Sequence, residues 1–81
     1  MTFWESVRDL RSKGRIPRQW RGADILPHLK RQFSVNTIRT VPANQSMSRD
    51  GKDKGNYVLR GAEPKAFRLD DGLYELIDDP N

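Results

Sequence analysis

The sequence has no cysteine among its 81 residues and only one histidine. Without cysteine the chain forms no disulfide bond and no thiolate metal site, so a domain this small has to be stabilised by packing. No apolar run approaches the ~20 residues that a membrane-spanning helix needs, and no signal peptide opens the sequence. We therefore expect one small domain over residues 1–81, located in the cytoplasm and not in a membrane.

The sequence also lacks the residue patterns of a catalytic or metal site. Its single histidine, His28, has no second histidine and no arranged acid near it in the sequence. Two pairs of carboxylates, Asp70-Asp71 and Asp78-Asp79, fall in an expected turn and in an expected frayed tail, residues 78–81. A two-metal site needs rigid, convergent ligands instead. We expect neither an enzyme nor a bound metal or cofactor.

The charges of the sequence are distributed unevenly. Residues 1–60 carry thirteen Lys and Arg against five acids, and residues 61–81 carry two against six, so a net charge of +8 and one of −4 sum to +4. Such asymmetry favours an anionic partner for the first part of the chain. Nucleic acid is the commonest partner of this kind for a small basic domain with a pI near 9.9. The densest basic run, residues 8–21, is either a flank for a duplex backbone or a solvated face.

A helix is expected close to the start of the sequence. Thr2 and Glu5 match a capping box, in which each residue satisfies a backbone N–H of the other. Apolar residues at helical spacing follow, so we expect a helix over residues 3–13. Both tryptophans are expected in the core, with Trp20 on a very short strand.

A second helix is expected to begin at Gly22 or Asp24 and to continue through Phe33. Its apolar residues recur at helical spacing and predict one buried face. Pro27 is compatible with this helix if it lies in the first turn, where backbone N–H groups lack helical partners.

A third helical element is expected to begin between Asn36 and Pro42. Asn36 is suited to an N-cap. Pro42 lacks a backbone N–H and argues against a regular helix that continues unbroken to Met47. The start of this element therefore stays undetermined within that interval.

The rest of the sequence indicates a loop and β-structure. Residues 48–55 have two glycines and no apolar side chain, which is typical of a loop, and residues 56–59 are expected to form a strand. Apolar and polar residues alternate over residues 67–69 and again over residues 74–76, with Asp-Asp-Gly between them. This pattern predicts a β-hairpin with its turn at residues 70–72.

One stretch, residues 34–48, carries many short hydrogen-bonding side chains around a single arginine, Arg39. Solvated helix faces usually carry Glu and Lys, whereas Asn, Gln, Arg, Ser and Thr are the residues that contact base edges. The alternative is a capped turn, because the same residue types populate caps and loops. The position of the stretch favours base contacts. Three helical elements followed by a hairpin form the winged-helix plan, in which the third helix enters the major groove.

The segments WRGADILPHLKRQF, NTIRTVPANQS and AFRLDDGLYEL resemble a winged helix that accompanies bacterial restriction nucleases and related defence proteins. The resemblance covers about residues 3–77. It implies an α+β winged helix-turn-helix that binds double-stranded DNA, with a fused or associated nuclease domain as a partner and, in some relatives, detection of a modified base. This sequence departs from the pattern in two places: the wing turn is acidic, and Pro42 lies within the third element.

These observations define a candidate DNA-binding set. The arginine is expected to bind guanine and the amides to bind adenine, while the cations that follow residue 48 contact phosphate in place of the acidic wing. The set is Asn36, Thr37, Arg39, Thr40, Asn44, Gln45, Ser46, Arg49, Lys52 and Lys54.

Two functions remain open on the sequence alone. The first is duplex DNA binding, sequence- or modification-dependent, through a recognition helix near residues 36–48, by a regulator or by the DNA-reading module of a restriction nuclease. The second is a protein–protein docking module with no direct DNA contact, which the acidic turn and tail favour.

Overall fold

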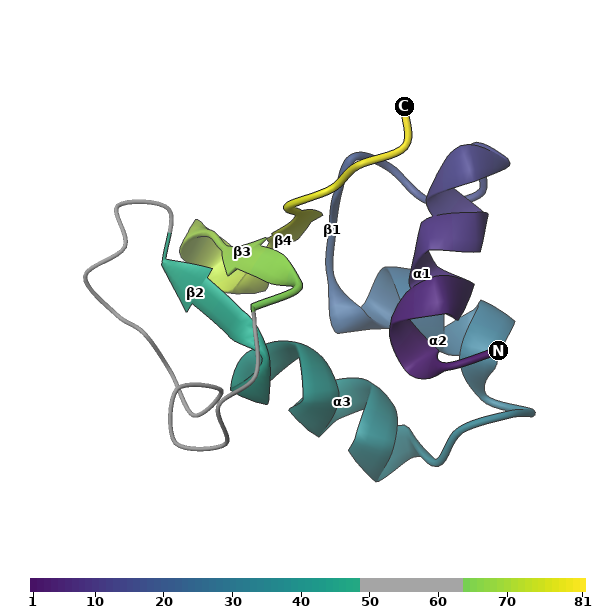
Figure 1. Cartoon of the computed structure of the whole chain (residues 1–81). Helices are drawn as coiled ribbons and strands as arrows, with labels where there is room; N and C mark the ends of the chain where they lie inside the picture. The colour runs from purple at the N-terminus through teal and green to yellow at the C-terminus, as the bar shows by residue number, and fades with distance from the viewer. Residues whose placement is uncertain (49–63) are drawn as a thin grey trace.

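The computed structural model describes residues 1–48 and 64–81, which form a small α+β domain (Figure 1). Three α-helices lie beside a four-stranded sheet in this part of the chain. The strand expected over residues 56–59, and most of the loop expected before it, lie outside the described residues. In chain order the elements are α1 (Phe3–Ser12), β1 (Gln19–Trp20), α2 (Gly22–Leu29), α3 (Val35–Asn44), β2 (Ser46–Ser48), β3 (Ala66–Arg68), the 3₁₀ turn η2 (Asp70–Gly72) and β4 (Tyr74–Leu76).

The predicted capping box begins α1. The backbone N–H of Glu5 donates to Oγ1 of Thr2 at 3.2 Å, and the N–H of Thr2 donates to Oε1 of Glu5 at 3.0 Å. The bond from the backbone N–H of Thr2 also lowers the pKa of Glu5, because it favours the charged carboxylate, and the Thr2 side chain adds to this effect. Three apolar residues at helical spacing, Phe3, Val7 and Leu10, form the buried face.

Helix α2 begins at Gly22 but ends at Leu29, one turn before the expected end at Phe33. Its N-terminus is capped by the carboxylate of Asp24, which accepts the backbone N–H of Arg21 at 2.8 Å. The chain then forms a turn whose N–H groups bond back to the carbonyl of Leu29. Pro27 lies inside the helix beyond its first turn, so the condition under which the sequence made this proline compatible with the helix is not met.

Helix α3 begins at Val35, and its N-cap is Ser34 instead of the expected Asn36. The hydroxyl oxygen of Ser34 accepts the backbone N–H of Thr37 at 3.1 Å. Pro42 lies within the helix and not at a boundary, which corrects the expected interruption. Its ring is fully buried near the C-terminal end of α3, so packing offsets the one backbone hydrogen bond that proline cannot donate.

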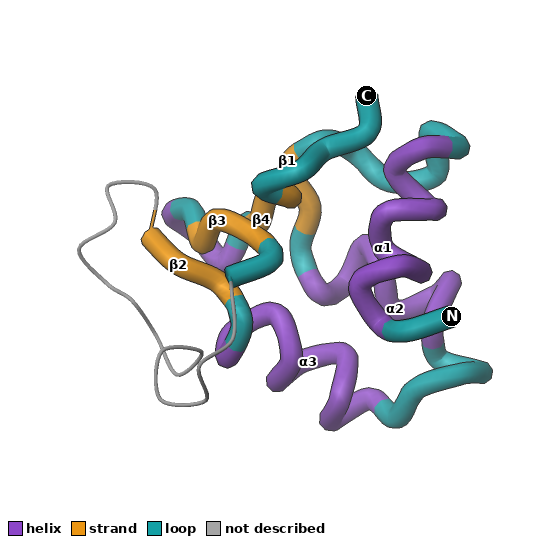
Figure 2. Tube along the Cα trace, viewed as in Figure 1, coloured by secondary structure: helices purple, strands orange, loops and turns teal. Residues whose placement is uncertain are grey.

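The sheet has the strand order β1-β4-β3-β2. The predicted hairpin is present: β3 and β4 pair antiparallel, and β1 pairs antiparallel with β4. Strand β2, which the sequence did not predict, pairs parallel with β3 directly after α3 (Figure 2). The expected recognition helix near residues 36–48 therefore ends at Asn44 and is followed by a strand.

The core lies between the helices and one face of the sheet. Trp20 is fully buried there, and its ring stacks on Tyr74 with 5.2 Å between the ring centroids. The half-buried Trp4 packs against Trp20, so both tryptophans belong to the core as predicted. No helix in the described ranges has the length and apolar character that crossing a membrane requires.

The segment after β4, which contains residues 78–81, forms hydrogen bonds and ion pairs with α1 and is not the frayed tail that the sequence suggested. The guanidinium of Arg11 donates to both carboxylate oxygens of Asp79, at 2.8 and 3.0 Å. It also donates to the carbonyl of Ile16 at 3.0 Å, and the side-chain amide of Asn81 donates to the carbonyl of Arg11. Both partners of the ion pair have side chains less than a tenth exposed, so this segment is part of the folded domain.

Candidate nucleic-acid interface

The outward face of α3 is polar and exposed. Ile38 and Pro42 are buried on the opposite face of the helix and fix its orientation on the core. Asn36, Arg39 and Thr40 therefore point towards solvent, at the spacing of residues that share one side of a helix. Base edges in a major groove are reached by side chains arranged in this way.

Arg39 is the cation of this face. Its side chain is exposed and makes no hydrogen bond or ion pair with the residues that the structure describes. An unpaired guanidinium on a helix surface presents several N–H donors in a planar fork. This geometry suits a pair of acceptors such as O6 and N7 of guanine, or two oxygens of a phosphate.

Two hydroxyl groups of α3 are engaged locally. Thr40 donates through Oγ1 to the carbonyl of Asn36 at 2.8 Å, and Ser34 donates to Oγ1 of Thr37 at 2.9 Å. Their oxygens keep acceptor capacity, because a hydroxyl oxygen has two lone pairs. Thr37 is only half-buried, whereas Thr40 is exposed beside Arg39. Thr40 is therefore the better placed of the two threonines for an outside partner.

The stretch of sequence around α3 contains no acidic residue. No Asp or Glu occurs between Asp24 and Asp50. Two exposed cations, Lys30 and Arg31, lie in the turn that precedes the helix. Residues 25–49, which include α3, therefore carry positive charge with no acid in the same stretch of sequence, and a phosphate backbone is attracted to such a segment.

Part of the basic run of residues 8–21 forms ion pairs with acids near the end of the chain. Arg8 pairs with Asp78, and Arg11 pairs with Asp79. Arg18 lies 3.8 Å from the same carboxylate of Asp79. Asp78 and Asp79 at the end of the sequence thus neutralise part of α1 and of the connector after it, whereas Asp70 and Asp71 stay exposed on the hairpin turn.

The pKa values reflect the central ion pair of this cluster. Hydrogen bonding to Arg11 lowers the pKa of Asp79, even though burial alone would raise it. The same bond raises the pKa of Arg11. The pair is therefore held in its charged form by direct contact.

Ser46 must be removed from the candidate DNA-binding set. Its side chain is completely buried, because Ser46 pairs with Ala66 and faces the core from β2. Gln45 has a structural partner: its side-chain oxygen accepts the indole N–H of Trp4 at 2.6 Å. Asn44 is half-buried at the last turn of α3. The predicted interface thus contracts towards the N-terminal half of the helix.

Three predicted phosphate contacts, Arg49, Lys52 and Lys54, lie outside the described residues. Arg68 on β3 is a described cation outside the predicted set. Alternation in Phe-Arg-Leu predicted the strand, but only the pairing of Arg68 with Ser48 and Tyr74 gives it a position in the sheet.

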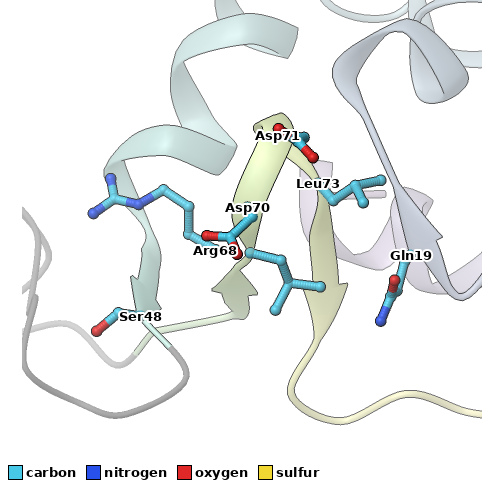
Figure 3. A pocket seen from close by; sticks show the side chains of 7 residues that line it. Gln19, Ser48, Arg68, Asp70, Asp71 and Leu73 are labelled. Carbon is cyan, nitrogen blue, oxygen red and sulfur yellow. The ribbon is translucent and has the colours of Figure 1, made fainter.

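Arg68 borders an open cleft beside the hairpin turn (Figure 3). The side chains of Asp70 and Asp71 lie on the turn, and the guanidinium of Arg68 extends away from them on the β2 side. The turn itself is held by Arg21, whose Nε–H donates to the carbonyl of Asp71 at 3.1 Å. The residues that line the cleft are Gln19, Ser48, Arg68, Leu69, Asp70, Asp71 and Leu73.

Among the described residues, no three His, Cys, Asp or Glu side chains come together as a metal site would require. Comparison of the chain with protein-family models, with curated proteins and with solved structures finds no match. The candidate interface is therefore defined by its own geometry, which is an exposed α3 face whose guanidinium, Arg39, has no partner among the described residues.

Proposed function

We propose that this domain is a winged helix-turn-helix that binds double-stranded DNA through α3. The order of the described elements supports the fold: α2 and α3 are consecutive, β1 follows α1, and the hairpin of β3 and β4 comes last. In that plan the third helix enters the major groove and the hairpin is the wing. The resemblance to modules of restriction nucleases supports either a stand-alone regulator or the DNA-reading part of a nuclease.

The observation that carries the proposal is the exposure of Arg39 on α3, within a stretch of sequence, residues 25–49, that contains no acid. An exposed arginine with no acid on its helix and two cations before the helix is suited to a polyanion. Its planar fork matches the two acceptors of guanine in the major groove, and the amide of Asn36, one turn earlier, matches adenine. Lys30 and Arg31 then contact phosphate, which fixes the position of the protein but conveys no sequence.

The test is a binding titration with a duplex selected from a random pool. Arg39→Ala should weaken binding to this duplex by about 1–3 kcal/mol, the usual range for a bidentate base contact. Arg15→Ala is the matched control. It removes the same charge from the exposed connector between α1 and β1, at the opposite end of the molecule from α3 (Figure 1). Equal losses for the two variants, or no duplex binding by the wild type, would contradict the proposal.

A second candidate function is protein docking. The exposed Asp70 and Asp71 favour it, because a wing that contacts phosphate is usually basic and this turn would be repelled by a duplex. NMR titration with random duplex at low and moderate salt separates the two functions. DNA binding predicts shifts of the backbone amides over residues 34–44, whereas docking predicts that these amides stay unshifted.

A further inference from the structure

Val35 is the first residue of α3, and it is 51% exposed. Among the described residues, the other large apolar residues with such exposure are Met1 and Ile77. Met1 is the first residue of the chain, and Ile77 follows the last strand. Of these three exposed residues in the described part of the chain, Val35 is therefore the one that lies in a helix. Its side chain lies one turn before Arg39, on the same side of α3.

The folding of α3 accounts for this valine only in part: it shares the i, i+3, i+7 spacing of the buried Ile38 and Pro42, but about half of its side chain stays exposed. Valine has a lower helix propensity than alanine, because its branched Cβ loses side-chain freedom. A hydrophobic staple at a helix start uses the residue before the N-cap and the fourth helical residue, which are Phe33 and Ile38 here. Both of those pack in the core. Val35 lies between them, outside the core, and contributes little to stability.

We propose that Val35 contacts the C5 methyl group of a pyrimidine in the major groove, next to the base that Arg39 binds. This inference rests on the proposed binding of duplex DNA by α3. The methyl group at C5 is the apolar feature that a pyrimidine displays in the major groove, and an apolar side chain distinguishes it by contact. The first residues of a recognition helix are those that reach base edges.

Thymine and 5-methylcytosine present the same methyl group in the same position, so both sources fit the contact. A side chain without an apolar surface, such as Ser or Asn, would not replace Val35 in this role, because it gains little by displacing water from a methyl group. The neighbouring Asn36 and Arg39 supply the hydrogen bonds, and Val35 supplies the selectivity for the methyl group. The methyl selectivity should therefore depend on Val35 and not on the overall charge of the helix.

The experiment uses the whole chain and a duplex selected from a random pool. Each thymine of the selected duplex is replaced singly by deoxyuridine, which removes only the methyl group, and each cytosine is replaced singly by 5-methylcytosine. One thymine replacement should weaken binding about fourfold, or one cytosine replacement should strengthen it about fourfold. This factor corresponds to the ~0.8 kcal/mol of one buried methyl-sized group. The first result identifies thymine as the source, and the second identifies 5-methylcytosine.

Val35→Ala should reduce that fourfold difference while keeping the fold, because alanine reaches less far towards the methyl group but is the better helix former at an exposed position. Ile77→Ala is the matched control, since it truncates another exposed apolar residue, after β4, and it should keep the difference. Wild-type binding that ignores every methyl change would overturn the inference, as would a methyl effect that persists undiminished in Val35→Ala. Neither of these results touches the proposed function, which fails if no duplex is bound or if Arg39→Ala and Arg15→Ala weaken binding equally.

Discussion

Trp4, in the first turn of α1, donates its indole N–H to the side-chain oxygen of Gln45 at 2.6 Å. Gln45 is the C-cap residue of α3 and lies 41 positions after Trp4, so this bond joins α1 to the end of α3. Trp4 also packs on Trp20 in the core. The hydrogen bond therefore helps to set the position of α3 on the core, and with it the direction of the polar face.

Gln45→Ala should lower the free energy of unfolding by about 1–2 kcal/mol. The variant leaves the half-buried indole N–H of Trp4 without its acceptor, and an unsatisfied donor of this kind costs about that much. Urea unfolding followed by tryptophan fluorescence measures the change. Gln32→Ala is the control, because Gln32 is exposed in the turn before α3 and should change stability by less than about 0.5 kcal/mol. Equal midpoints for the two variants would contradict a structural role for Gln45.

The stability of the domain should fall on acidification through the carboxylate of Asp79. The pKa of Asp79 is lower in the folded protein than in the unfolded chain because Arg11 holds the charged form. The carboxylate therefore stabilises the fold fully above the unfolded pKa, near 3.8, and this stabilisation is lost as pH falls through the folded pKa. Urea unfolding at a series of pH values from neutral to about 2 measures the loss.

Asp79→Asn should remove this part of the pH dependence and destabilise the domain by about 3 kcal/mol at neutral pH. The cost arises because the variant leaves the guanidinium of Arg11 buried without its counter-charge. Asp78→Asn is the matched control: the Arg8–Asp78 pair is largely exposed, and loss of an exposed pair costs at most about 1 kcal/mol. Similar losses of unfolding free energy for both variants would show that the buried Arg11–Asp79 pair stabilises the fold no more than the exposed Arg8–Asp78 pair.

The sequence predicted the elements that depend on local chemistry. The capping box of Thr2 and Glu5 needs only residues three apart, and it was read correctly. The hairpin was also read correctly, because its alternation and its Asp-Asp-Gly turn are local. The left-handed backbone at Asp71 (φ 61°) and Gly72 (φ 74°) is the conformation that such turn residues tolerate.

Several of the errors involve packing or partners that are distant in the sequence, whereas the N-cap of α3 and the end of α2 were misplaced by a few residues. Ser46 was taken as an exposed polar residue, but its pairing with Ala66 buries it. The last residues looked mobile because they are acidic and contain proline, but Arg11, 68 positions earlier, binds Asp79. Pro42 looked like a helix boundary because only its missing N–H is visible in the sequence, whereas the burial of its ring is not.

Lys30 and Arg31 should account for much of the salt dependence of DNA binding. If both contact phosphate, Lys30→Ala combined with Arg31→Ala should reduce the slope of log affinity against log salt by about 2, because each phosphate contact contributes roughly 0.9. The preferred DNA sequence should stay the same, since phosphate contacts carry no base information. The double variant Lys13→Ala with Arg15→Ala is the control: it removes two charges near the end of α1, away from α3, and should leave the slope nearly unchanged. Equal slopes for the two double variants would mean that the turn before α3 does not contact the duplex.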